Sequence, residues 1–174
     1  MRFSVVLALF AASLATADNV VEFVNQDSTT RTITFTENAG SEGIQPVTLG
    51  GLQTQSVTFP EAWVGNWWAK AEGSDLSSGM LGEVAWNGWG GITYFDVSAI
   101  VNPEDGNGVK MLYPKSSQSP MSGCQTFPCS NAYNQPDDLQ TLSTTESTLV
   151  CLVGNKGSQS SRRHARHFVT GHHA

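Results

Sequence analysis

Two carboxylates, Glu83 and Asp96, are the side chains of this sequence whose type and spacing best suit chemistry. Each stands in a run typical of a β-strand, residues 81–87 and 91–97. Successive strand residues point to opposite faces, so Glu83 and Asp96 can face one cleft from neighbouring strands. Glycoside hydrolysis needs such a pair, because one carboxyl protonates the leaving oxygen while the other acts as nucleophile or activates water. Judged by spacing alone, solvated carboxylates or carboxylates paired with lysine are the commoner outcome.

The tryptophans cluster near these carboxylates. All five lie in one part of the chain: Trp63, Trp67, Trp68, Trp86 and Trp89. Aromatic rings stack on sugars, so the cluster suggests a carbohydrate site, to which Tyr94 on the face of Asp96 would add a ring. Large aromatic residues on strands are more often core. We expect Trp68 and Trp86 to be buried, and Trp67 and Trp89 to be the exposed members.

Histidine is confined to the end of the chain, at His164, His167, His172 and His173. The body therefore lacks the residue that Ser-His-Asp and Cys-His catalytic arrangements require. The sequence predicts no metal site and no cofactor. Weak binding of a transition metal by the tail histidines is the alternative.

The sequence predicts β-strands as the elements that position the carboxylates and the aromatic residues. Residues 31–36 alternate between apolar and threonine side chains, and no segment shows a sustained helical repeat. Many short strands joined by turns rich in Gly, Pro, Asn and Asp predict an all-β fold, an antiparallel β-sandwich. The expected strands cover residues 20–25, 31–36, 46–49, 55–59, 66–71, 81–87, 91–97, 109–113 and 148–153.

The two ends of the chain differ from its body. Residues 1–17 have a basic start, an apolar run and small closing residues, which predicts a secretory signal peptide. The apolar run is shorter than the roughly 20 residues that span a bilayer. Residues 18–154 then form one domain. Residues 155–174 form a basic tail with little to bury, which we expect to be disordered.

Charge limits the possible partners, and cysteine content limits the possible disulfides. All 15 acidic residues lie between Asp18 and Glu146, where only four lysines and arginines oppose them. Such a body repels phosphates, so nucleic acid is not expected as a partner. The three cysteines allow at most one intramolecular disulfide in the secretory route. A local bridge between Cys124 and Cys129 is one of the possible pairings.

Four motifs occur in an order that resembles the thaumatin-like family, in particular its short fungal secreted members. They are W-A-K (68–70), L-G-E-V (81–84), Y-F-D-V-S (94–98) and S-G-C-x4-C-S-N-A-Y (122–133). The resemblance implies a β-sandwich whose acidic cleft binds β-1,3-glucan, with weak endo-β-1,3-glucanase activity in some members. The chain departs from the family at Val101, where a further acid is expected, and in lacking most of the family's cysteines.

The same resemblance assigns roles to particular residues. Lys70 takes the place of the family's cleft arginine and would keep Glu83 or Asp96 charged. Cys124 would pair with Cys151, leaving the third cysteine free.

Two functional hypotheses follow. In the first, a secreted monomer binds β-glucan at a cell wall through Lys70, Trp67, Trp89 and Tyr94, with at most weak hydrolysis by Glu83 and Asp96. In the alternative, the chain is a non-enzymatic secreted antigen, effector or wall component that binds a host or wall protein.

Overall fold

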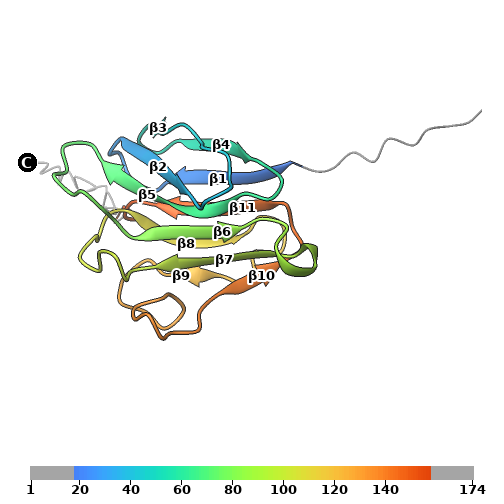
Figure 1. Cartoon of the computed structure of the whole chain (residues 1–174). Helices are drawn as coiled ribbons and strands as arrows, with labels where there is room; N and C mark the ends of the chain where they lie inside the picture. The colour runs from blue at the N-terminus through green and yellow to red at the C-terminus, as the bar shows by residue number, and fades with distance from the viewer. Residues whose placement is uncertain (1–17, 158–174) are drawn as a thin grey trace, which may run out of the picture.

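The computed structural model describes residues 18–157 and shows two β-sheets packed face to face (Figure 1). The predicted all-β sandwich is confirmed. The expected signal peptide and residues 158–174 of the expected disordered tail lie outside the described residues. The strands are β1 (Asn19–Asn25), β2 (Arg31–Glu37), β3 (Val47–Leu49), β4 (Thr54–Phe59), β5 (Val64–Ala71), β6 (Leu81–Ala85), β7 (Thr93–Ser98), β8 (Val109–Pro114), β9 (Ser122–Gly123), β10 (Leu142–Thr144) and β11 (Thr148–Val153).

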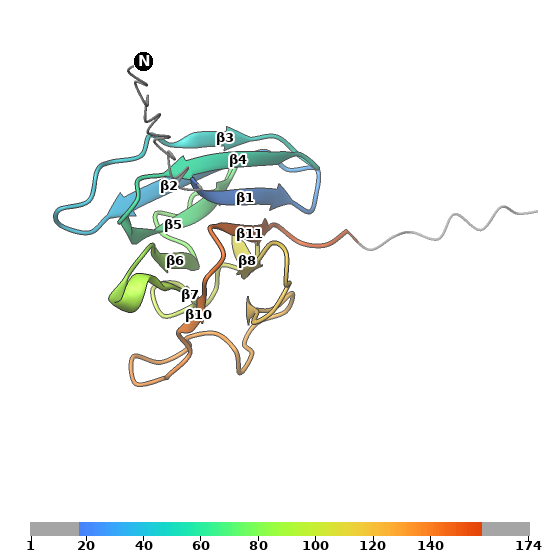
Figure 2. The ribbon, with the colours of Figure 1, turned by 90° about the vertical axis from the view of Figure 1, so that its right-hand side faces the viewer.

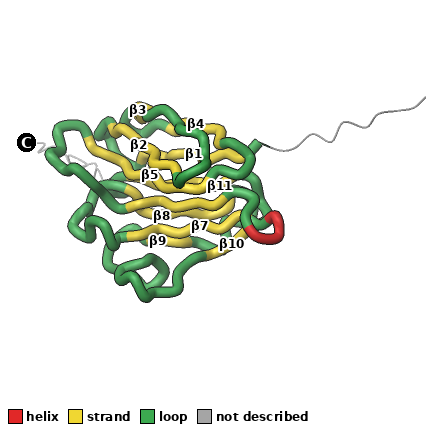
Figure 3. Tube along the Cα trace, in the orientation of Figure 1, coloured by secondary structure: helices red, strands yellow, loops and turns green. Residues whose placement is uncertain are grey.

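The sheets contain five strands in the order β4-β1-β11-β8-β9 and six in the order β10-β7-β6-β5-β2-β3. Figure 2 shows them as two layers, with β5, β6 and β7 in one and β1, β11 and β8 in the other. All paired strands of the described chain are antiparallel except β1 and β11, which run parallel. Loops join the strands, and one 3₁₀ turn, η1 (Trp89–Gly91), is the helical element of the described part (Figure 3). Within residues 18–157, no helix has the length and apolar character needed to cross a membrane.

Aromatic rings fill the space between the sheets. They come from both layers and contact one another in edge-to-face and tilted pairs: Phe23, Phe35, Phe59, Trp63, Trp67 and Trp86. The Phe59 ring lies 5.0 Å from that of Trp63 and 5.7 Å from that of Trp67, measured between centroids. Such pairs contribute about 0.5–1.5 kcal/mol each beyond the area they bury. This core fixes which residues of each strand face outward.

Trp67 belongs to the core, so the prediction that it is exposed is wrong; its exposed fraction is 0%. Trp67 and Trp68 are consecutive in β5 and must face opposite layers. Trp67 shares the inner face with the small Ala69, which leaves room for its indole, and its Nε1–H donates to Cys151 Sγ at 3.4 Å. Trp68, expected in the core, is half-buried on the outer face. Trp86 is fully buried, as predicted.

Gly82 determines the orientation of β6. It lies opposite Trp67 in the register of β5 and β6, and a Cβ atom on it would come within 2.6 Å of the indole ring. Only glycine accommodates the buried ring at this point. With Gly82 and Val84 facing the core, Glu83 faces outward.

The disulfide joins Cys124 to Cys129, and the pairing of Cys124 with Cys151 implied by the thaumatin-like resemblance is wrong. Cys151 lies in β11 and points into the core, where it is fully buried. The other two cysteines lie in the loop that follows β9. Burial raises the pKa of the Cys151 thiol to about 12, so it stays protonated despite the hydrogen bond from Trp67.

A fully buried arginine connects three segments at one end of the sandwich. The Arg31 guanidinium donates to the Asp27 carboxylate at 2.7 Å and 2.9 Å, to Asn25 Oδ1 at 2.6 Å and to the Asn107 carbonyl at 3.1 Å. Asp27 also accepts from the backbone N–H of Asn155 at 2.9 Å. Although burial opposes it, the hydrogen bond from Arg31 lowers the pKa of Asp27 to about 2.

Candidate functional site

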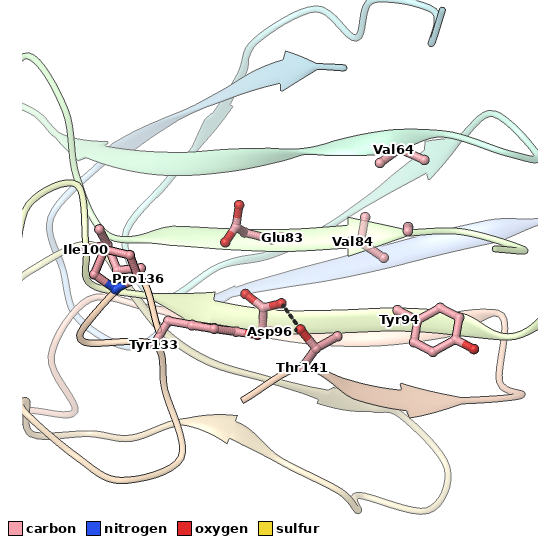
Figure 4. Close-up of a pocket in the computed structure, with 10 residues that line it drawn as sticks. Val64, Glu83, Val84, Tyr94, Asp96, Ile100, Tyr133, Pro136 and Thr141 are labelled. Atoms are coloured by element: carbon pink, nitrogen blue, oxygen red, sulfur yellow. Dashed lines mark hydrogen bonds between the residues drawn. The ribbon is translucent and has the colours of Figure 1, made fainter. Parts of the chain in front are cut away.

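A cavity of about 360 Å³ opens on the outer face of the six-stranded sheet (Figure 4). Strands β6 and β7 supply its floor, and the chain between β9 and β10 supplies one wall. The lining residues are Val64, Glu83, Val84, Ala85, Tyr94, Asp96, Ile100, Tyr133, Pro136 and Thr141. The cavity thus combines two carboxylates with aromatic and aliphatic surface.

Glu83 and Asp96 form a carboxyl pair on this floor. They are directly opposite each other in the register of β6 and β7. Asp96 is only 8% exposed, and no N–H or O–H group of the described chain donates to its Oδ1. Burial, together with the neighbouring charge of Glu83, raises the pKa of Asp96 to about 7. Near neutral pH the Asp96 carboxyl is therefore partly protonated.

Two residues from the wall orient Asp96. The Thr141 hydroxyl donates to Asp96 Oδ2 at 3.3 Å, and the Tyr133 hydroxyl lies 2.8 Å from Thr141 Oγ1 and donates to it (Figure 4). Sequence reasoning missed the role of both. Thr141 directly precedes β10, whose sequence Leu142-Ser-Thr has no alternating pattern long enough to predict a strand.

The rim of the cavity extends to exposed side chains. The Tyr94 hydroxyl donates to the Trp89 carbonyl at 3.2 Å, and this bond ties the rim to the turn at η1. Trp89 is 86% exposed, as predicted, and Ile100 and Val101 are exposed after the end of β7. Tyr94 thus lines the cavity, and its hydrogen bond connects the cavity to the turn that carries Trp89.

Lys70 and Trp67 do not join this site. Lys70 lies on the same outer face but lines a second cavity, together with Arg31, Thr32 and Glu72. It makes no ion pair with Glu83 or Asp96, because the ion pairs among residues 18–157 are those of Arg31 with Asp27 and of Lys115 with Glu22. The expectation that Lys70 keeps the cleft carboxylates charged is therefore wrong. Trp67 contacts the core instead.

No group of three His, Cys, Asp or Glu side chains within residues 18–157 is arranged to hold a metal ion.

Comparison with known proteins establishes the family of the chain. No protein-family model matches it. The chain is 50% identical over 134 residues to the antigenic protein SchS21 of Stachybotrys chartarum, an alignment that covers 77% of this chain and 93% of that protein. The chain belongs to the SchS21 family. The alignment spans nearly the whole relative.

A solved structure shares the architecture of this SchS21-family protein. The crystal structure of the protein elicitor MoHrip2 from Magnaporthe oryzae matches with a TM-score of 0.57 over 78% of this chain and 98% of that one. The sequence identity is 19%, so this likeness shows a common fold and nothing finer.

The resemblance to thaumatin-like proteins is wrong. SchS21 matches by sequence and MoHrip2 is among the solved structures that match by fold, and neither similarity points to thaumatin. The motifs that suggested it are short strand segments with one charged residue each, a pattern that β-sandwiches of different families can share.

Proposed function

We propose that this chain is a secreted, extracellular protein of the antigen or effector type, which acts by binding a protein of another organism. The proposal is supported by its membership of the family of SchS21, a protein described as antigenic. The disulfide between Cys124 and Cys129 agrees with an oxidising extracellular compartment.

We place the binding surface at the cavity over β6 and β7. The observation that carries this choice is an exposed apolar rim around a buried carboxyl whose hydrogen-bonding capacity is not filled by the protein. Trp89 and Tyr94 are large, stiff side chains of the kind that anchor protein interfaces. Ile100 adds aliphatic surface at the other end of the cavity.

A capture experiment tests the proposal. The purified chain is immobilised and exposed to solubilised surface proteins of host cells; a retained protein is identified, purified and titrated against the chain. We expect Trp89→Ala to weaken that purified complex at least tenfold, as for an anchor residue worth about 1.4 kcal/mol or more. Leu52→Ala is the matched control, because Leu52 is 72% exposed but lies away from the cavity.

A pull-down on insoluble β-1,3-glucan, with chitin and cellulose as controls, tests the alternative of glucan binding. Selective retention on glucan that Trp89→Ala abolishes, without any retained protein, would refute the protein-binding proposal. Release of reducing sugar from the same tubes would show hydrolysis in place of binding.

A further inference from the structure

One oxygen of the carboxyl pair, Asp96 Oδ1, accepts no hydrogen bond from the described chain. Asp96 lines the cavity and is only 8% exposed. A buried oxygen in this state costs about 1–3 kcal/mol unless something donates to it. In the free protein, burial and the charge of Glu83 raise the pKa of Asp96 to about 7, so some molecules carry a proton on this carboxyl near neutral pH.

No positive charge of the protein compensates the pair. None of the residues that line the cavity is a lysine or an arginine, and Lys70 on the same face of the sheet lines another cavity. Opposite charge and hydrogen-bond donors are therefore the features that a complementary ligand must bring.

Aromatic rings stand beside the carboxylates. Tyr133 and Tyr94 both line the cavity, and Figure 4 shows them on either side of Asp96. A cation that enters between them meets ring faces as well as carboxylate oxygens, and ring faces attract lysine and arginine head groups. The cavity volume of about 360 Å³ is ample for one such side chain.

We propose that the cavity receives the cationic end of a lysine or arginine side chain from a protein partner, which pairs with the carboxylates of Glu83 and Asp96. The inference rests on the proposed protein-binding function and adds the chemistry of the partner. Where Asp96 is protonated, the entering ammonium or guanidinium group displaces that proton to solvent, and no covalent bond changes in the partner.

Binding of the cation is linked to pH by this exchange. The titratable groups that line the cavity are Glu83 and Tyr94 from the sheet, Asp96 itself, and Tyr133 from the wall. The pKa of Asp96 is about 7, so this carboxyl titrates near neutral pH. Displacing one proton makes the apparent affinity rise with pH below that value and level off above it.

The probes are small amides that present one side chain each. Nα-acetyl-arginine methylamide and Nα-acetyl-lysine methylamide are titrated into ¹⁵N-labelled protein, with the uncharged citrulline and norleucine amides as controls. We expect shifts confined to amides of β6, β7 and the wall, and a dissociation constant that falls roughly 50-fold between about pH 5 and pH 7.

Two variants and one control test whether the NMR shifts depend on Glu83 and Asp96. Asp96→Asn and Glu83→Gln each remove one charge and are expected to weaken binding of the charged probes at least tenfold and to abolish its pH dependence. Glu37→Gln, at an exposed carboxylate that ends β2 in the same sheet, is expected to change nothing. Because Glu83 is half-exposed, Glu83→Gln serves as the test should Asp96→Asn fail to fold.

Several results would overturn the inference: equal shifts with the citrulline amide, a dissociation constant that does not depend on pH, or no shifts with either charged probe. Other results test the proposed protein binding independently of the cation. A purified partner that loses affinity with Trp89→Ala but not with Glu83→Gln would uphold protein binding and refute the cation. Failure to retain any host protein would refute protein binding, whatever the probes show.

Discussion

Replacement of Asp96 by asparagine is expected to stabilise the protein above neutral pH. Burial and the charge of Glu83 hold the pKa of Asp96 at about 7. In the unfolded chain an aspartate titrates near 3.9, so the folded state keeps a proton that the unfolded state releases. The stability contributed by that proton is fully present below about pH 4 and is lost progressively as the pH rises to about 7.

The difference between the two pKa values sets the magnitude. At 1.36 kcal/mol for each pH unit, it corresponds to about 4 kcal/mol, an upper figure because the pKa of Asp96 depends on the charge of Glu83. Asp96→Asn removes the ionisation. We therefore expect the variant to unfold less readily than the wild type at about pH 8, by about 2–4 kcal/mol, and with a smaller advantage at about pH 5.

Urea denaturation followed by tryptophan fluorescence between about pH 4 and pH 8 provides the measurement. The wild type should lose free energy of unfolding across this range, while Asp96→Asn should show a flatter profile. Glu37→Gln should follow the wild type, since this carboxylate is exposed. A variant that is destabilised equally at both ends of the range would refute the raised pKa of Asp96.

Three further perturbations test the architecture. Gly82→Ala should destabilise the fold by about 1–3 kcal/mol in urea, because its Cβ would overlap the Trp67 indole; an unchanged midpoint would contradict the close approach. Cys151 should be inert to a thiol reagent in the native protein and should react as a single thiol after unfolding without reductant, whereas a reactive native thiol would contradict its burial. Arg31→Met should cost about 3–5 kcal/mol by leaving Asp27 without its partner, and a loss below about 1 kcal/mol would show that the pair is dispensable.

The sequence predicted the faces of the central strands well where alternation was strict. Glu83 stands in a strand whose burial alternates, and Asp96 shares a face with Tyr94 two residues earlier in β7, so their meeting across β6 and β7 could be anticipated. The pair Trp67-Trp68 could not be oriented in this way, because two adjacent indoles satisfy either orientation of the strand. A glycine on the neighbouring strand, Gly82, resolves the choice.

The sequence did not predict the wall of the cavity. Thr141 reaches Asp96 from a long connection in which only the three residues of β10 pair with a sheet. Its position depends on contacts between distant residues, as in the hydrogen bond between Tyr133 and Thr141. The disulfide was misassigned for a related reason: Cys151 is drawn into the core by the alternation of β11, which the borrowed family pattern did not take into account.

The parallel pairing of β1 with β11 affects how the chain acquires its shape during synthesis. β11 lies between β1 and β8, so the middle of the five-stranded sheet comes from residues 148–153, near the end of the chain. A nascent chain that stops before Thr148 has its first strand and β8 in place with bare edges, which are surfaces that chaperones shield and that aggregate when left uncovered. The five-stranded sheet therefore closes only after residues 148–153 have left the ribosome.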